Sequence, residues 1–77
     1  MIKKHKPKYP FSTNMSKGFE YVNPTVTTED IIEVTHINKH AELEGGYGVC
    51  IHLMTGDFKG YKGYIPFAVF NNVFEEI

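Results

Sequence analysis

The side chains able to carry chemistry in this 77-residue chain are few, and their spacing fits neither a metal centre nor a catalytic group. The soft ligands that lie nearest one another in the sequence are His36, His40, Cys50 and His52. A zinc site needs four ligands and usually draws them from local pairs, so we expect no bound metal. Cys50 and His52 would share one face of a strand but stand too far apart for a direct hydrogen bond, and no third group orients the imidazole.

The carboxylates and glycines also lack the spacing of an active site. No two acidic residues are placed to act as general acid and general base, and Asp57 is typical of a turn. The glycines do not form the phosphate-binding pattern G-x-x-x-x-G-K-[ST] before a helix. We therefore expect a protein that is not an enzyme and needs no cofactor.

Aromatic side chains gather around two glycine-rich segments, and we expect these residues to bind a partner. Exposed aromatic residues among glycines are usual parts of a surface that recognises a peptide or a base. The alternative is that Phe58 or Tyr64 only covers one end of the fold. The candidate partner-binding residues are Tyr47, Phe58, Lys59, Tyr61, Lys62 and Tyr64.

The formal charge of −1 is divided unevenly along the chain. Residues 1–18 hold five lysines and no acid, whereas residues 19–77 hold three lysines and nine acids, which gives 3 − 9 = −6. Arginine is absent, which weighs against base-specific contacts with nucleic acid. Because an acidic body repels phosphates, we expect a protein partner, with Glu42, Glu44 and Asp57 on the rim of the contact. Nucleic acid would need the basic N-terminal segment.

Residues 1–18 contain Pro7, Pro10 and Gly18 and show no hydrophobic period, so we expect a flexible, separable arm before the folded domain. The alternative is an arm that lies along a partner. One cysteine and the lack of a signal peptide or membrane span favour a soluble, cytoplasmic protein. The frequent Lys, Ile and Asn, with no Arg, Gln or Trp, suit an AT-rich genome and, by association alone, an accessory protein encoded by a phage.

The hydrophobic pattern predicts an all-β fold over residues 19–77. Alternating apolar residues and dense β-branching indicate five strands, at 19–22, 31–37, 49–54, 61–69 and 73–77. Gly56, Gly60 and Gly63 mark a tight hairpin and a bend, and Gly63 should need an unusual backbone or a close contact. So short a sheet is best closed into a small barrel. The expected core is Ile32, Val34, Val49, Ile51, Leu53, Ile65, Phe67, Val69 and Val73.

Two short motifs resemble known families of small barrels. The strand that starts at Asp30, the segment Gly63–Pro66 and a closing strand at 73–77 together resemble a Src-homology barrel. That resemblance implies a five-stranded barrel, in which Tyr47 lies roughly where the peptide-groove Trp of the family would fall. The hairpin 49–65 is similar to the KOW motif of ribosomal proteins and transcription elongation factors. This second resemblance implies that Phe58, Lys59, Tyr61 and Lys62 form a loop that touches RNA, the ribosome or RNA polymerase.

The two resemblances agree on a fold and differ on the ligand. From the charge of the body we expect a non-catalytic module that binds a protein, as an adaptor or a small modulator or inhibitor. The alternative is a KOW-like module that binds RNA, the ribosome or RNA polymerase.

Overall fold

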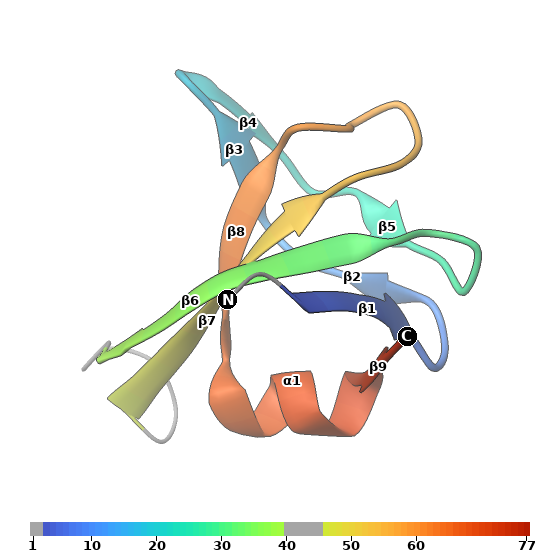
Figure 1. Ribbon diagram of the computed structural model, residues 1–77. Coiled ribbons are helices and arrows are strands. Elements are labelled where there is room, and N and C mark those ends of the chain that lie inside the picture. Colours follow the sequence, from blue (N-terminus) through green and yellow to red (C-terminus); the bar gives the residue numbers. More distant parts are fainter. Residues whose placement is uncertain (1–2, 40–45) are drawn as a thin grey trace.

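The computed structural model describes residues 3–39 and 46–77, and strands dominate both segments (Figure 1). The elements are β1 (Lys3–Pro7), β2 (Phe11–Ser12), β3 (Met15–Lys17), β4 (Glu20–Val22), β5 (Thr25–Val26), β6 (Ile32–Lys39), β7 (Tyr47–Leu53), β8 (Lys62–Pro66), α1 (Phe67–Val73) and β9 (Phe74–Glu76). The all-β class predicted from the sequence is confirmed. The described residues form nine strands rather than five, because several are only two or three residues long.

Seven of these strands form one antiparallel sheet in the order β4-β3-β8-β7-β6-β1-β9, and β2 pairs separately with β5. The long β6–β7 hairpin lies at the centre of the sheet, and β8 returns along β7 (Figure 1). Ile32, Val34 and Ile37 supply the β-branching that favours this central strand. β4 and β9 are the end strands of the order, so the sheet is open.

Residues 3–17 do not form the extended, separable arm that we expected. β1 lies inside the sheet between β6 and β9, and β3 pairs with β4 and β8. The sequence did not indicate β1, because its buried residues are His5 and Pro7 rather than large apolar side chains, and they alternate with exposed lysines. Met15 is almost completely buried in the core. Removing residues 1–14 would therefore take β1 and β2 out of the fold.

The segment after Pro66 is a helix where we expected the strand of residues 61–69 to continue. The apolar run that begins at Phe67 fits both the two-residue period of a strand and the 3.6-residue period of a helix. The pattern of buried residues shows which of the two forms. Phe70 and Val73, three positions apart, face the core, whereas the Phe67 side chain is 41% exposed. Pro66 precedes the helix with the fixed φ that suits a helix start, at −58°.

The core lies between the sheet and α1. Of the nine expected core residues, six are buried: Ile32, Val49, Ile51, Leu53, Ile65 and Val73. Val34 and Val69 are partly buried and pack against the cluster, whereas Phe67 lies outside it. Met15, from the segment that we had placed outside the domain, and Val26, from a stretch that we had not assigned to a strand, also belong to the core.

The tight packing of β8 explains the glycine at position 63. A Cβ atom there would lie 2.6 Å from the backbone oxygen of Asn14, so a side chain cannot fit unless the backbone moves. The expected close contact is thereby confirmed. Gly56 and Gly60 have φ of 80° and 94°, as expected for the tight connection between β7 and β8.

Candidate functional site

Phe58 and Tyr61, in the connection between β7 and β8, turn inward. Tyr61 is buried in the core, and Phe58 is half-buried with its ring at 5.5 Å from the Tyr61 ring in an edge-to-face arrangement. The Tyr61 hydroxyl donates a hydrogen bond to the Glu20 carboxylate, which ties the hairpin to β4. Both aromatic residues therefore act mainly in packing.

The hydrogen bond to Glu20 also affects the ionisation of Tyr61. The bond holds the proton on the phenol, and burial and the negative charge of Glu20 add to the effect, so the pKa of Tyr61 is raised above its ordinary value. The hydroxyl thus stays neutral at physiological pH. It serves as a fixed hydrogen-bond donor from the β7–β8 connection to β4.

The lysines of the same hairpin point outward. Lys59 and Lys62 are both exposed, and Lys17 of β3 places its ammonium 6.0 Å from the centre of the Tyr61 ring. A Cβ atom on Gly60 would also lie 3.5 Å from the Lys17 Nζ, so this cation borders the turn. The β8 end of the hairpin therefore presents positive charge.

Tyr47 lies at the start of β7, at the opposite end of that strand from the β7–β8 connection. Together with Ile37 of β6 and Phe67 of α1 it lines a hollow of about 250 Å³, which we call the apolar hollow. The three side chains are 50% (Ile37), 46% (Tyr47) and 41% (Phe67) exposed. Residues two positions inward, Val49 and Ile65, are in the core, so the apolar hollow continues the core face of the sheet to the surface.

Lys62 and Tyr64 lie on the opposite, exposed face of the sheet. Directly paired residues share a face, so the register gives a row Tyr21–Ser16–Lys62–His52 from β4 to β7. A second row contains Tyr64, Cys50 and His36. These rows bring polar and aromatic side chains from five strands onto one face of the sheet, on which Cys50 is buried.

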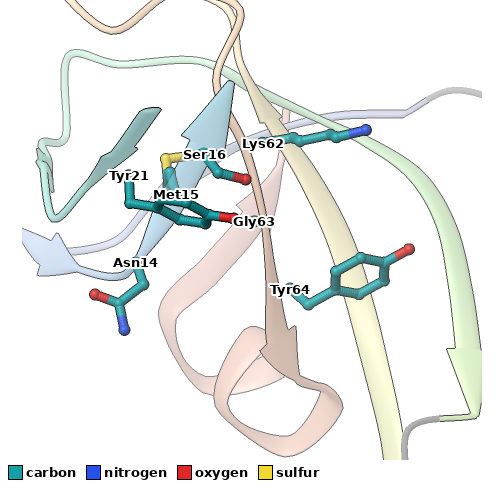
Figure 2. A pocket seen from close by; sticks show the side chains of 7 residues that line it. All are labelled: Asn14, Met15, Ser16, Tyr21, Lys62, Gly63 and Tyr64. Atoms are coloured by element: carbon teal, nitrogen blue, oxygen red, sulfur yellow. The ribbon is translucent and has the colours of Figure 1, made fainter. Parts of the chain in front are cut away.

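Tyr64 is held in place by β6. The Tyr64 hydroxyl and His36 Nε2 are 2.7 Å apart in a hydrogen bond, and the two rings meet edge to face at 5.7 Å. Tyr64, Lys62 and Gly63 line a second hollow of about 230 Å³ with Tyr21 of β4, which we call the tyrosine hollow (Figure 2). Of the six predicted site residues, this hollow contains only Lys62 and Tyr64.

A third hollow, of about 450 Å³, lies between β1, β6 and α1. His5 lines it, 9% exposed, and packs against Phe70 with ring centres 4.9 Å apart. Its Nδ1 atom is buried without a hydrogen-bond partner in the described part of the chain. An ion pair of 3.6 Å between Lys3 and Glu76 borders the opening.

Asp30 organises the turns at the other end of β6. Its carboxylate accepts hydrogen bonds from the Thr55 hydroxyl at 2.6 Å and from the Thr27 backbone amide at 2.9 Å, with a third from the Thr27 hydroxyl. Burial alone would raise the pKa of Asp30, but these hydrogen bonds together outweigh it and the pKa is lowered. This cluster joins two turns and is structural.

Within residues 3–39 and 46–77, no three His, Cys, Asp or Glu side chains lie close enough together to hold a metal ion. Cys50 is buried, with His36 as its partner in the register. His40, Glu42 and Glu44 lie outside the described residues. No helix in the described part of the chain is long and apolar enough to cross a membrane.

The sequence interpretation missed Ile37 and Phe67, which share a hollow with Tyr47, and Tyr21, which lies beside Lys62 and Tyr64. Ile37 and Phe67 were assigned to strands, and Phe67 to the core. The Pro66–Phe67 step was the available signal for Phe67, since proline often begins a helix. No family model, curated protein or solved structure matches this chain.

Proposed function

We propose that this chain is a non-catalytic binding module whose partner is a protein. The observation that carries the proposal is the apolar hollow, where Ile37, Tyr47 and Phe67 are each two-fifths to one-half exposed around one depression. Large apolar side chains gathered around a depression at the surface are typical of the centre of a protein interface. A tyrosine adds a hydroxyl that can pair with the partner.

The architecture around the hollow supports a preformed site. Ile37 and Tyr47 come from the two strands of the central hairpin, and Phe67 begins α1. Ile37 pairs directly with the buried Val49, and Tyr47 and Phe67 each lie two positions from a buried core residue, Val49 and Ile65. A partner side chain would therefore meet an ordered surface, and less conformational entropy would be lost on binding.

The KOW-like alternative has weaker support in the geometry. Its loop would touch RNA with Phe58 and Tyr61, yet Tyr61 is buried and Phe58 is half-buried. The lysines of β1 were the cations that nucleic acid would need, and Lys4 and Lys6 lie directly opposite Glu33 and Glu75. The charge available for phosphates is thereby reduced.

A Src-homology-like arrangement is part of the proposal for the fold. Three features support it: the antiparallel succession β6–β7–β8, the segment Gly63–Pro66 at the end of β8, and the short helix α1 that leads into β9. We propose that β1 to β4 are additions to this central unit. The additions leave the sheet open and give it seven strands.

Affinity capture tests the function directly. The tagged chain is incubated with cell lysate, with and without nuclease, and the bound proteins are identified. We expect one protein that is retained after nuclease and lost with Tyr47→Ala or Phe67→Ala. Tyr9→Ala is the matched control, because Tyr9 is also about half exposed and does not line the hollow. Recovery that depends on intact nucleic acid would overturn the proposal.

A further inference from the structure

The open sheet has two outer strands, and they differ in how they are protected. In the part of the chain that the structure describes, no strand pairs with the outer side of β4 or of β9. An outer strand exposes backbone N–H and C=O groups that can pair with another strand, and charged side chains discourage such pairing. β9 carries the exposed Glu75 and Glu76, whereas the only charged residue of β4 is Glu20, whose carboxylate is hydrogen bonded to Tyr61. β4 is therefore the less protected of the two.

The two most exposed aromatic side chains among the described residues lie at β4. Phe19, in the turn that joins β3 to β4, is 97% exposed, and Tyr21 is 80% exposed. The β3–β4 hairpin projects beyond the other strands, so a second chain can reach it (Figure 1). Tyr21 lines the tyrosine hollow on the side of β3 (Figure 2), and a strand added on the other side of β4 would contact the rest of this side chain.

Two residues limit the segment with which a second strand can pair. Gly18, with φ of 62°, lies in the hairpin turn, where the chain reverses its direction. Pro24, which follows β4, has no N–H group to donate. The segment between them is 19–23, and its middle residue is Tyr21. An antiparallel pair formed by two copies of this segment is therefore centred on Tyr21.

The backbone of Tyr21 has the orientation that such a pair needs. β3 ends at Lys17 and β4 begins at Glu20, and these two residues are directly paired across a two-residue turn. In such a hairpin the pair next to the turn exchanges backbone hydrogen bonds, and the backbone groups of the next residue point away from the neighbouring strand. The Tyr21 N–H and C=O groups thus face the outer side of β4.

We propose that two copies of this chain pair antiparallel along β4, with Tyr21 of each copy opposite the partner's Tyr21. The two tyrosine backbones then exchange a pair of hydrogen bonds. Glu20 lies opposite the partner's Val22, so no like charges are directly opposed. The same arrangement at β9 would place Glu75 opposite the partner's Glu75, which is destabilising. The charges of the two outer strands therefore favour β4 as the contact.

The proposed contact is small, so the dimer should be reversible. Phe19 and Tyr21 from both copies together cover about 600–1,000 Å². That area is below the roughly 1,200–2,000 Å² of a stable interface. We therefore expect single chains at low concentration and dimers at high concentration. Neither Phe19 nor Tyr21 lines the apolar hollow, so the dimer leaves that hollow free for a protein partner.

Sedimentation equilibrium of the full-length chain, from micromolar to millimolar concentration, tests the proposal. We expect the average mass to rise towards twice that of one chain. Tyr21→Lys and Tyr21→Glu each place like charges opposite each other and should weaken dimerisation about five-fold or more. An equal mixture of the two variants should recover the dimer, because opposite charges then face each other. Tyr9→Lys is the matched control, since Tyr9 is 50% exposed and lies outside the strands.

Crosslinking through Tyr21→Cys gives a second measurement that does not depend on these charges. Directly paired residues have Cα atoms about 5.5 Å apart, which a disulfide spans. Mild oxidation should therefore link two copies of this variant and leave Tyr9→Cys largely unlinked. The wild-type chain should not link, because Cys50 is buried.

Three results would overturn the proposal. One is the mass of a single chain at millimolar concentration. Another is a mixture of the two charge variants that associates no better than either variant alone. The last is a dimer that is lost with Tyr47→Ala and retained with Tyr21→Lys, which would place the contact at the apolar hollow.

Discussion

Lys6 of β1 lies directly opposite Glu75 of β9 in the sheet. The neighbouring strand pair repeats this relationship, with Lys4 opposite Glu33, and Lys3 forms an ion pair of 3.6 Å with Glu76. The basic N-terminal segment and the acidic remainder of the chain are thus complementary surfaces of one sheet. Strand pairing thus places lysines of the N-terminal segment directly opposite acidic residues from the rest of the chain.

Exchanging these charges tests that explanation. Lys6→Glu places like charges opposite each other, and we expect it to destabilise the fold by roughly 0.2–1 kcal/mol. Glu75→Lys alone should have a similar effect, and the double exchange should restore most of the loss. Thermal unfolding at low and at high salt measures this. Additive losses in the double variant would show that the two side chains do not interact.

Gly63 should tolerate no side chain. Gly63→Ala places a Cβ atom 2.6 Å from the Asn14 backbone oxygen, so β3 and β8 must separate locally. We expect a loss of more than about 1 kcal/mol in urea unfolding. Lys62→Val, at the neighbouring exposed position of the same strand, is the control and should change stability little. Equal stability of the two variants would contradict the close approach of these strands.

The hydrogen bonds to the Asp30 carboxylate should make the folded protein less stable in acid. The pKa of Asp30 is lowered in the folded state, so its contribution is fully present above the pKa of the unfolded chain, near 3.8. The contribution is lost as pH falls through the lower folded pKa. Asp30→Asn should lower stability at pH 7 by about 1–2 kcal/mol, since hydrogen bonds to a charged group are weakened. The difference between the two proteins should shrink towards pH 3, and an unchanged difference would exclude Asp30 as the cause.

Sequence patterns identified the centre of the fold and failed at its edges, for physical reasons. Ile32, Val49 and Ile51 alternate with polar residues in long strands, which is a strong signal. β1 buries His5 and Pro7, whose types do not distinguish a strand from a loop. The candidate site depended on which aromatic side chains are exposed, and the sequence alone does not give this. It could not show that Tyr61 packs inward, or that Tyr47 lines a hollow together with Phe67 of α1.

The Tyr61–Glu20 hydrogen bond predicts that one tyrosine ionises at a higher pH than the others. The raised pKa of Tyr61 means that its contribution to stability is present below about pH 10 and is lost as pH rises through the higher folded value. Absorbance titration near 295 nm should show one of the five tyrosines ionising above the others. Glu20→Gln should bring that transition down towards the rest, and Glu29→Gln should not. A single common transition in the wild-type protein would contradict the hydrogen bond.

The central claim is that the apolar hollow contacts a protein, and site-specific photo-crosslinking measures this most directly. A benzophenone amino acid replaces Tyr47 in one sample and Tyr9 in another, and both are irradiated in lysate after nuclease treatment. The proposed interface predicts one polypeptide adduct at position 47 that is absent at position 9 and lost when Phe67→Ala is added. The same adducts at both positions, or no polypeptide adduct at position 47, would contradict it.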